Sequence, residues 1–223
     1  MTALFVVSRG DDLDTHQAGL LDAARAWQEL NPSGRIAVDC VTRDQSLLEA
    51  NGMRSQDPVA WHAVTHLWGP GTPPDELAAA WGTWAGWQVD VHLAWPYRRS
   101  WAAGTPTPGV KQVSLVARRS ELSHDEFVRR YHGHADVARV HHAGIWQYRQ
   151  NTVVRALGNR DDELAIAGMS ELWFASEQRW RTRFYSGPES PAAVAEDTRA
   201  FIDYRNTCSL MVTETRFDTS STA

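Results

Sequence analysis

Hydrophobic and polar positions alternate with two different periods in the first half of the chain. The apolar run at residues 4–8 is typical of a strand. Apolar residues at helical spacing then predict a helix that ends at Asn31-Pro32: Ala18, Leu21, Ala24 and Trp27. The later elements predicted in this half are strands at 35–42, 63–68 and 87–95 and a helix at 75–84, with a polar loop through Asn51-Gly52.

The same order of elements returns after a stretch rich in glycine and proline, Ala102 to Gly109, which is the predicted linker. The elements predicted beyond it are strands at 112–117, 146–153, 169–174 and 209–217, a helix at 123–141, and helical segments at 177–184 and 192–204. Each half therefore follows strand, helix, strand, strand, helix, strand. This is the ferredoxin-like βαββαβ pattern.

Short sequence echoes support an internal duplication. Val7-Ser8-Arg9 is echoed by Val116-Ala117-Arg118, and His66-Leu67-Trp68 is echoed by Glu171-Leu172-Trp173. Each half also has a candidate capping box at the start of its first helix. These two boxes are Asp14 with Gln17, and Ser123 with Glu126.

The predicted fold is α+β, with two tandem ferredoxin-like units. A βαββαβ unit leaves one face of its sheet bare, so two fused units can bury those faces against each other and form an intrachain α+β barrel. The predicted divisions are a degenerate half at 1–105, a second half at 110–217 and a flexible tail at 218–223. A further pairing of two barrels into a homodimer is compatible with this pattern.

Charge and apolar content limit the classes of partner that the protein can bind. The net charge is −5 and the arginines are scattered among acids, so no nucleic-acid partner is predicted. The sequence shows neither a signal peptide nor an apolar run long enough to span a bilayer, so we expect no membrane partner and a cytoplasmic location. Cys40 and Cys208 are isolated in predicted strands and are interpreted as reduced core thiols.

Tryptophan is the most unusual component, with 11 residues in the chain. Its large flat surface suits either a packed interface between elements or a cavity for an aromatic guest. Packing is the interpretation we favour for most of them, with a few lining a pocket as well. The tryptophans before the linker are Trp27, Trp61, Trp68, Trp81, Trp84, Trp87, Trp95 and Trp101.

The second half, from about Lys111 to Phe217, resembles an EthD domain of the dimeric α+β barrel superfamily. The segments that carry the resemblance are residues 123–127 through Tyr131 to His134, Tyr148 with Gln150-Asn151, residues 171–174, and Asp197 through Phe201 and Asp203 to residues 211–214. The family spaces its aromatic residue and histidine one residue further apart and has an apolar residue at Asp136. The first half resembles the fold only, because Arg25 stands at the position equivalent to His134.

The chemistry in the residues themselves points to the predicted helix at 123–141. Phe127, Tyr131, His134, Ala138 and His141 form one stripe at three- and four-residue spacing, so His134 should face the sheet and the barrel cavity. A histidine there can act as a general base or acid. The alternative is a core histidine bonded to a backbone carbonyl.

Other histidines crowd this helix, but no metal site is predicted. His132 and His134 resemble a ligand pair, yet positions two apart on a helix face away from each other. His124 lies at the helix start, and His142 follows His141 at the helix end.

Strand residues complete the candidate site. Glu171 and Trp173 share one face of their strand, from which Glu171 could orient His134, and His66 could approach the same cavity from the first half. Tyr148 and Asn151 point to opposite faces, and Tyr148 is the preferred donor to an oxyanion. The predicted catalytic residues are His134, Tyr148 and Glu171, and the predicted substrate-binding residues are Tyr131, His66, Trp68, Trp173, Asn151 and His141.

Cofactor-binding motifs are absent from the sequence, so no cofactor is predicted. The leading hypothesis, which the resemblance implies, is a cofactor-independent lyase or cyclase that decarboxylates, dehydrates or cyclises an aromatic or polyketide-like substrate in secondary metabolism or aromatic degradation. The first alternative is a cofactor-free oxygenase of anthrone-type phenols. The second is a carrier that shields a hydrophobic aromatic ligand without chemistry.

Overall fold

The computed structural model describes residues 1–49, 61–69, 74–157 and 166–218. Its first half contains β1 (Thr2–Arg9), α1 (Leu13–Leu30), β2 (Arg35–Val41), α2 (Ser46–Glu49), β3 (Ala63–Trp68), α3 (Asp75–Trp81) and β4 (Thr83–Trp95). Its second half contains β5 (Val110–Ala117), α4 (His124–His141), β6 (Ile145–Leu157), β7 (Ile166–Phe174), α5 (Glu177–Arg183), α6 (Ser190–Arg199) and β8 (Cys208–Arg216).

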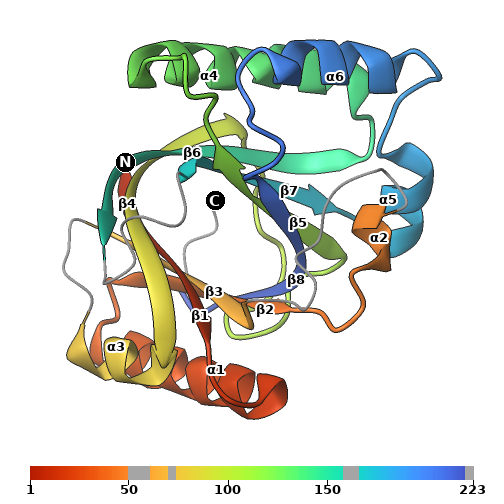
Figure 1. The fold of residues 1–223 in the computed structure, drawn as a ribbon. Coiled ribbons are helices and arrows are strands. Elements are labelled where there is room, and N and C mark those ends of the chain that lie inside the picture. The colour runs from red at the N-terminus through yellow and green to blue at the C-terminus, as the bar shows by residue number, and fades with distance from the viewer. Residues whose placement is uncertain (50–60, 70–73, 158–165, 219–223) are drawn as a thin grey trace.

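The strands close into one antiparallel barrel in the order β1-β3-β2-β8-β5-β7-β6-β4. Within each half the order is fourth, first, third, second strand, which is the arrangement of a ferredoxin-like unit. Two junctions, β2 with β8 and β4 with β6, join the halves. The prediction of two tandem units that form an intrachain barrel is confirmed, and Figure 1 shows the strands encircling one interior.

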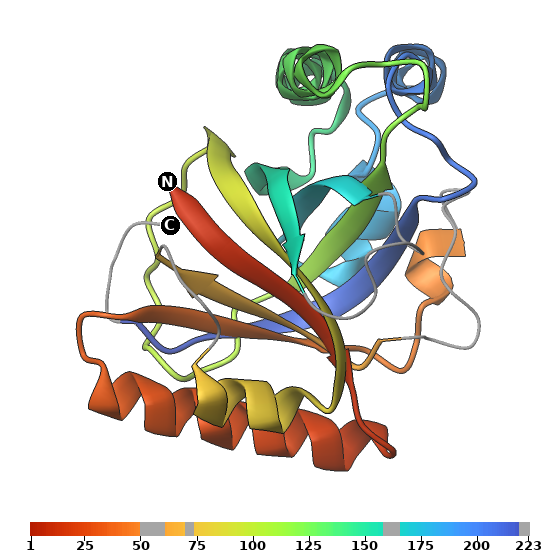
Figure 2. The same ribbon diagram turned by 60° about the vertical axis from the view of Figure 1, so that its left-hand side comes forward.

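Helices cover opposite sides of this barrel. α1 and α3 pack together against the outer face of the first half, while α4 and α6 lie side by side over the second half (Figures 1 and 2). Because successive residues of a strand point to opposite faces, every strand contributes one set of side chains to the barrel interior and another to a helix layer. This alternation sorts the candidate site residues into two separate places.

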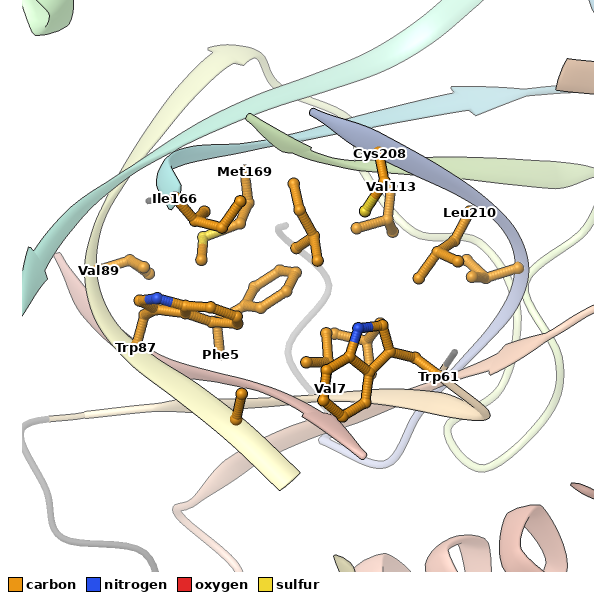
Figure 3. Close-up of a cluster of buried hydrophobic side chains, with 14 of the residues drawn as sticks. Phe5, Val7, Trp61, Trp87, Val89, Val113, Ile166, Met169, Cys208 and Leu210 are labelled. Atoms are coloured by element: carbon orange, nitrogen blue, oxygen red, sulfur yellow. The ribbon is translucent and has the colours of Figure 1, made fainter. Parts of the chain in front are cut away.

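The interior near one end of the barrel is apolar. Phe5 and Val7 from β1 meet Trp87 from β4, Met169 from β7 and Leu210 from β8, and all are at most 3% exposed. Figure 3 shows these side chains pointing toward one another from strands of both halves. Neither half could bury this surface alone, so the core stabilises the fused barrel as a unit.

Local signals account for the helix ends, with one correction. The capping box of Ser123 and Glu126 at α4 is confirmed. The capping box of Asp14 and Gln17 is wrong: Asp12 caps α1 by accepting from the Thr15 amide at 2.9 Å. The Gln17 amide instead donates to the carbonyl oxygens of Val41 and His62.

Other boundaries also shift for physical reasons. The helix predicted at 75–84 ends at Trp81 because Gly82 adopts a φ of +64°, and β4 then begins at Thr83. The four-residue helix α2 was not predicted, since it is too short to show a period. The loop at Asn51-Gly52 lies outside the described residues.

The predicted linker is fixed to the barrel. The amides of Gly104 and Thr107 donate to the carbonyl oxygens of Arg216 and Glu214, each at 2.7 Å. Gly109 has a φ of +93°, and a Cβ there would lie 2.0 Å from the carbonyl oxygen of Phe174, so the chain needs glycine at its entry into β5.

The prediction of a flexible tail is wrong for its first residue. Asp218 is 2% exposed, and its carboxylate accepts from the Arg216 guanidinium at 2.9 Å. Residues 219–223 lie outside the described part of the chain.

We predict that Phe5→Ala lowers the free energy of unfolding by about 3–5 kcal/mol, because it opens a cavity in the shared interior. Val154→Ala, at an exposed position of β6, should cost less than about 1 kcal/mol. Urea unfolding followed by circular dichroism measures both. Equal losses for the two variants would contradict a tightly packed common core.

Candidate functional site

A cavity of about 580 Å³ lies between the outer face of the second-half sheet and the helices α4 and α6. We call it the helix–sheet pocket. Its volume falls in the range of small-molecule sites. Its lining residues include, from the sheet, Gln112, Ser114, Val116, Tyr148, Ser170, Leu172 and Ser209, and, from the helices and loops, Tyr131, His134, His142, Phe184, Tyr185, Thr198, Phe201 and Tyr204.

The α4 stripe predicted from the sequence contributes Tyr131 and His134 to the pocket lining. Phe127, Tyr131, His134 and Ala138 are all buried on one face of the helix. His141 departs from the stripe, because its Nδ1 lies 3.0 Å from the Ser190 hydroxyl, and it is not among the residues that line the pocket. The structure therefore does not place His141 with His134.

His134 forms the central polar contact of the pocket. Its Nδ1 lies 2.7 Å from Oδ2 of Asp197 on α6. With a proton on Nδ1 donated to the carboxylate, the lone pair is on Nε2. The His134 side chain is 10% exposed and that of Asp197 is 35% exposed. This pair is the arrangement by which a carboxylate orients a histidine base.

Two tyrosines and a serine line the pocket near this histidine. The Tyr131 hydroxyl lies 2.8 Å from the Ser170 hydroxyl, and the Gln150 amide donates to the Tyr148 hydroxyl at 3.2 Å. Burial raises the pKa of Tyr148 to about 12 and the pKa of Tyr131 well above its usual value. Both phenols therefore stay protonated near neutral pH and can act as hydrogen-bond donors.

Glu171 does not join His134. It points into the barrel, where its Oε1 accepts from the Asn151 amide at 2.7 Å, while Tyr148 and Ser170 point outward to the helix layer. Strand alternation correctly places Glu171 with Trp173, and Asn151 opposite Tyr148, but the shared face is the barrel interior. The predicted contact between Glu171 and His134 is wrong.

His66 also lies inside the barrel. Its Nε2 is 2.8 Å from Oδ2 of Asp39, and its ring stacks near Trp68 with centroids 5.9 Å apart. Thus His66 and Trp68, like Glu171, Trp173 and Asn151, are separated from the helix–sheet pocket by the sheet itself. The predicted approach of His66 to the cavity of His134 is wrong.

A buried ion cluster explains these interior residues. The Lys111 ammonium is 2.7 Å from Asp39, 2.6 Å from Glu171 and 3.2 Å from Glu214. Lys111 is 1% exposed, and these carboxylates, Asp39 first, raise its pKa against the effect of burial. Against the effect of burial, Lys111, followed by Arg149 and Arg216, holds the pKa of Glu214 down to about 2. Lys111, followed by His66 and Arg149, keeps the pKa of Glu171 well below its usual range.

Asp39, His66 and Glu171 could also supply ligand atoms to a metal, since one atom of each lies within 4.8 Å of the others. Lys111 contacts two of these carboxylates and so supplies the positive charge that balances them. His132 does not belong to this group of three residues. Its ring stacks on that of His92, with ring centroids 4.3 Å apart.

The tryptophans pack the protein and do not line the pocket. All of them lie in the described ranges, and none is among the residues that line the helix–sheet pocket. Trp61 and Trp87 fill the barrel, Trp81 fills the α1 layer, and Trp180 packs from α5 into the core cluster that contains Phe174. The aromatic walls of the pocket are tyrosines and phenylalanines.

Two functional features were missed from the sequence. Asp197 was noted only as part of the family resemblance, and its pairing with His134 joins residues 63 positions apart. The polar strand residues Gln112, Ser114 and Ser170 face the helices, whereas the first half places Leu4, Val6 and Ile36 at comparable outward positions. That contrast is the sequence signal that could have located the pocket.

Residues 119–205 match the family model described as the EthD domain. This part of the chain is similar to EthD domains. The match spans α4 and α6, so it contains both His134 and Asp197. No curated protein matches the chain.

Solved structures share the arrangement of both halves. An anthrone oxidase-like protein aligns with a TM-score of 0.56 and 15% identity over 96% of this chain and 92% of its own. A proposed monooxygenase from Fusobacterium nucleatum gives a TM-score of 0.59 and 8% identity over 99% and 94%. One from Lactobacillus acidophilus gives 0.54 and 7% over 99% and 96%. At these identities the likeness shows the fold.

The match to the EthD domain, together with the pocket, indicates a small-molecule function, catalytic or binding. Among the helices of the described ranges, none is long and apolar enough to cross a membrane.

We predict that His142 makes stability depend on pH. Burial lowers its pKa from 6.5 to about 4, and its Nδ1 lies 2.5 Å from the Phe184 carbonyl oxygen. The unfolded chain takes up a proton near pH 6.5 and the folded chain only near pH 4, so this contribution is complete above pH 6.5 and is lost as pH falls toward 4. The loss is on the order of 3 kcal/mol.

His142→Gln should flatten the dependence of the unfolding free energy on pH between 6.5 and 4, measured by urea unfolding. His124→Gln, at an exposed histidine at the start of α4, serves as the control. A wild-type slope retained in His142→Gln would contradict the assignment.

Proposed function

We propose that this protein is a cofactor-independent enzyme that removes a proton from an enolisable or phenolic aromatic compound bound in the helix–sheet pocket. The observation that carries the proposal is the 2.7 Å contact between His134 and Asp197 in the wall of an aromatic-lined cavity. Such a pair gives a base whose free nitrogen has a defined direction.

The first step needs only the residues of the pocket. A C–H bond beside the carbonyl breaks, its proton goes to Nε2 of His134, and its electron pair moves onto the carbonyl oxygen. Asp197 stabilises the resulting imidazolium, and the protonated Tyr148 donates a hydrogen bond to the oxyanion. Tyr131 and Ser170 offer a second hydroxyl pair for another oxygen of the substrate.

The pocket lining favours a flat substrate with several oxygens. Phe184, Tyr185 and Phe201 supply aromatic surface. Ser114 and Ser209, whose hydroxyls are 2.7 Å apart, supply polar contacts on the sheet side. Aromatic ketones and polyketide-like phenols combine these two properties.

The leading reaction is a lyase or cyclase reaction. In a dehydration, the electron pair released by deprotonation expels a hydroxide beta to the carbonyl, and this hydroxide leaves as water after it takes the proton from His134. In a cyclisation, the same electron pair attacks a second carbonyl carbon and closes a ring. For a β-keto acid, Nε2 of His134 takes the carboxyl proton, and the carboxylate then loses carbon dioxide to give an enolate. The imidazolium of His134 returns its proton to the enolate carbon. These outcomes require no oxidant.

The second candidate is a cofactor-free oxygenase, favoured by the fold shared with a protein named anthrone oxidase-like. Here the carbanion reduces O₂: a methylene carbon becomes a carbonyl with one oxygen atom, and the other oxygen leaves as water. The deprotonation step is common to both candidates, and only the fate of the electron pair differs.

We predict that the protein exchanges the enolisable hydrogens of anthrone-type and β-polyketone probes for deuterium in D₂O without oxygen, as followed by NMR. His134→Ala should slow this exchange by about 10²–10⁴-fold. Asp197→Asn should slow it at least about 10-fold, because the imidazole loses its orienting carboxylate.

His124→Ala, at an exposed position of α4, should exchange at the wild-type rate. Circular dichroism and melting temperature verify that the variants are folded. Exchange by wild-type protein that survives in His134→Ala would refute the assignment of the base.

We predict that mass spectrometry of aromatic and polyketide-like acids and ketones, incubated with and without O₂, separates the two candidates. A lyase or cyclase gives loss of water or carbon dioxide, or an isomer of equal mass, in both atmospheres. An oxygenase gives a product of higher mass only with O₂. Intact recovery of every ligand that binds would count against both and support a carrier.

A further inference from the structure

Arginines gather at the end of the barrel opposite its apolar core. The guanidinium carbons of Arg35, Arg149 and Arg216 lie 5.0, 5.3 and 5.2 Å from the ring centroid of Trp68. They come from three different strands: β2, β6 and β8. Arg99, which follows β4, approaches the same group, since its side chain donates to the carbonyl oxygen of Asp218.

Arg149 is the most deeply buried arginine of this group, and its terminal nitrogens lack a hydrogen-bond acceptor among the described residues. It is 2% exposed and lies between Trp68 and Trp173, at 5.3 and 5.0 Å from the ring centroids. Its nearest carboxylate oxygen is Oε2 of Glu171, 3.7 Å from Nη1, which is too far for a hydrogen bond. Both terminal nitrogens, Nη1 and Nη2, are buried and have no hydrogen-bond partner within the described ranges.

The neighbouring carboxylates are already engaged. Lys111 contacts Asp39, Glu171 and Glu214, and Arg216 holds Asp218 through Nε and Nη2. Glu214 also accepts from Thr107 and Trp173. In the described part of the chain, five cationic side chains therefore face four carboxylates at this end: Lys111, Arg35, Arg99, Arg149 and Arg216 against Asp39, Glu171, Glu214 and Asp218.

Two further arginine nitrogens at this end of the barrel are also buried donors without an acceptor among the residues that the structure describes. Nε of Arg35 and Nη1 of Arg99 are buried and have no hydrogen-bond partner within the part of the chain that the structure describes. Burial, and then the neighbouring Arg216, lower the pKa of both guanidinium groups. A buried charged donor without an acceptor destabilises the folded state more than a neutral donor does. A ligand that accepts hydrogen bonds from several of these donors therefore stabilises the folded protein.

We propose that the mouth of the barrel binds an oxyanion, a carboxylate or a phosphate group of a small molecule, between Arg149, Arg35 and Arg99. The planar fork of Arg149 matches two oxygens of either group. Trp68 and Trp173 hold that fork in place from both sides. Arg35, Arg99 and Trp68 are half-buried, so the mouth is open to solvent from their side.

This site is separate from the helix–sheet pocket. Arg149 points into the barrel from β6, whereas Tyr148, its neighbour on the same strand, points outward to the pocket. Anion binding at the mouth therefore does not depend on His134. A negative result for the proposed reaction would leave this proposal unaffected, and the reverse also holds.

Isothermal titration calorimetry with sodium phosphate and with sodium benzoate, at constant ionic strength set by chloride, tests the proposal. We expect saturable binding of one anion per chain. Arg149→Gln should weaken it about 10-fold or more, the usual effect of losing a hydrogen bond to a charged group. Arg99→Gln, at a less buried position, gives the same test if Arg149→Gln unfolds.

Arg155→Gln is the matched control, because Arg155 is an exposed arginine of the same strand that donates to Gln88. It should bind as the wild type does, and so should His134→Ala. Tighter binding of phosphate assigns a phosphorylated ligand, and tighter binding of benzoate assigns a carboxylic acid. The proposal would be overturned if the wild type showed no saturable binding, or if Arg149→Gln and Arg99→Gln both bound the anion as tightly as the wild type. Water would then be the partner of these donors.

Discussion

The alternation of side chains along closed, paired strands is the constraint on which the rest of this structure depends. Strands β2 and β8 on one side and β4 and β6 on the other join the two halves, so the bare sheet faces become one interior. Outward residues then face the helix layers or solvent, and inward residues face the shared barrel interior. Tyr148 and Arg149 are adjacent in sequence, yet one belongs to the proposed reaction pocket and the other to the proposed anion site.

The interior is divided along its length by polarity. Phe5, Trp87 and Leu210 make one end a hydrophobic core, while Lys111 and its carboxylates occupy the other. Buried ion pairs contribute little net stability compared with apolar packing, because desolvation offsets the Coulomb attraction. The Lys111 cluster does link the two halves of the chain, since Asp39 comes from the first and Glu171 from the second.

Local patterns predicted much of this architecture. The α4 stripe and the Ser123–Glu126 capping box depend on residues a few positions apart, and both are confirmed. Alternation also paired Glu171 with Trp173 correctly. The sequence did not reveal which face of β7 looks inward, because both faces of that strand are buried along its whole length. The contact of His134 with Asp197 depends on how α4 and α6 pack, and no spacing rule reports a contact between distant helices.

The filled α1 layer has a consequence for how such a chain can change. In the first half, Leu20, Ala24 and Trp81 pack the space that corresponds to the helix–sheet pocket of the second half. Two identical subunits would carry every substitution in both copies, so closing one pocket would close the other. A fused chain is free of that symmetry. One half can become a purely structural support, while the other retains the cavity and accumulates changes that suit a single ligand.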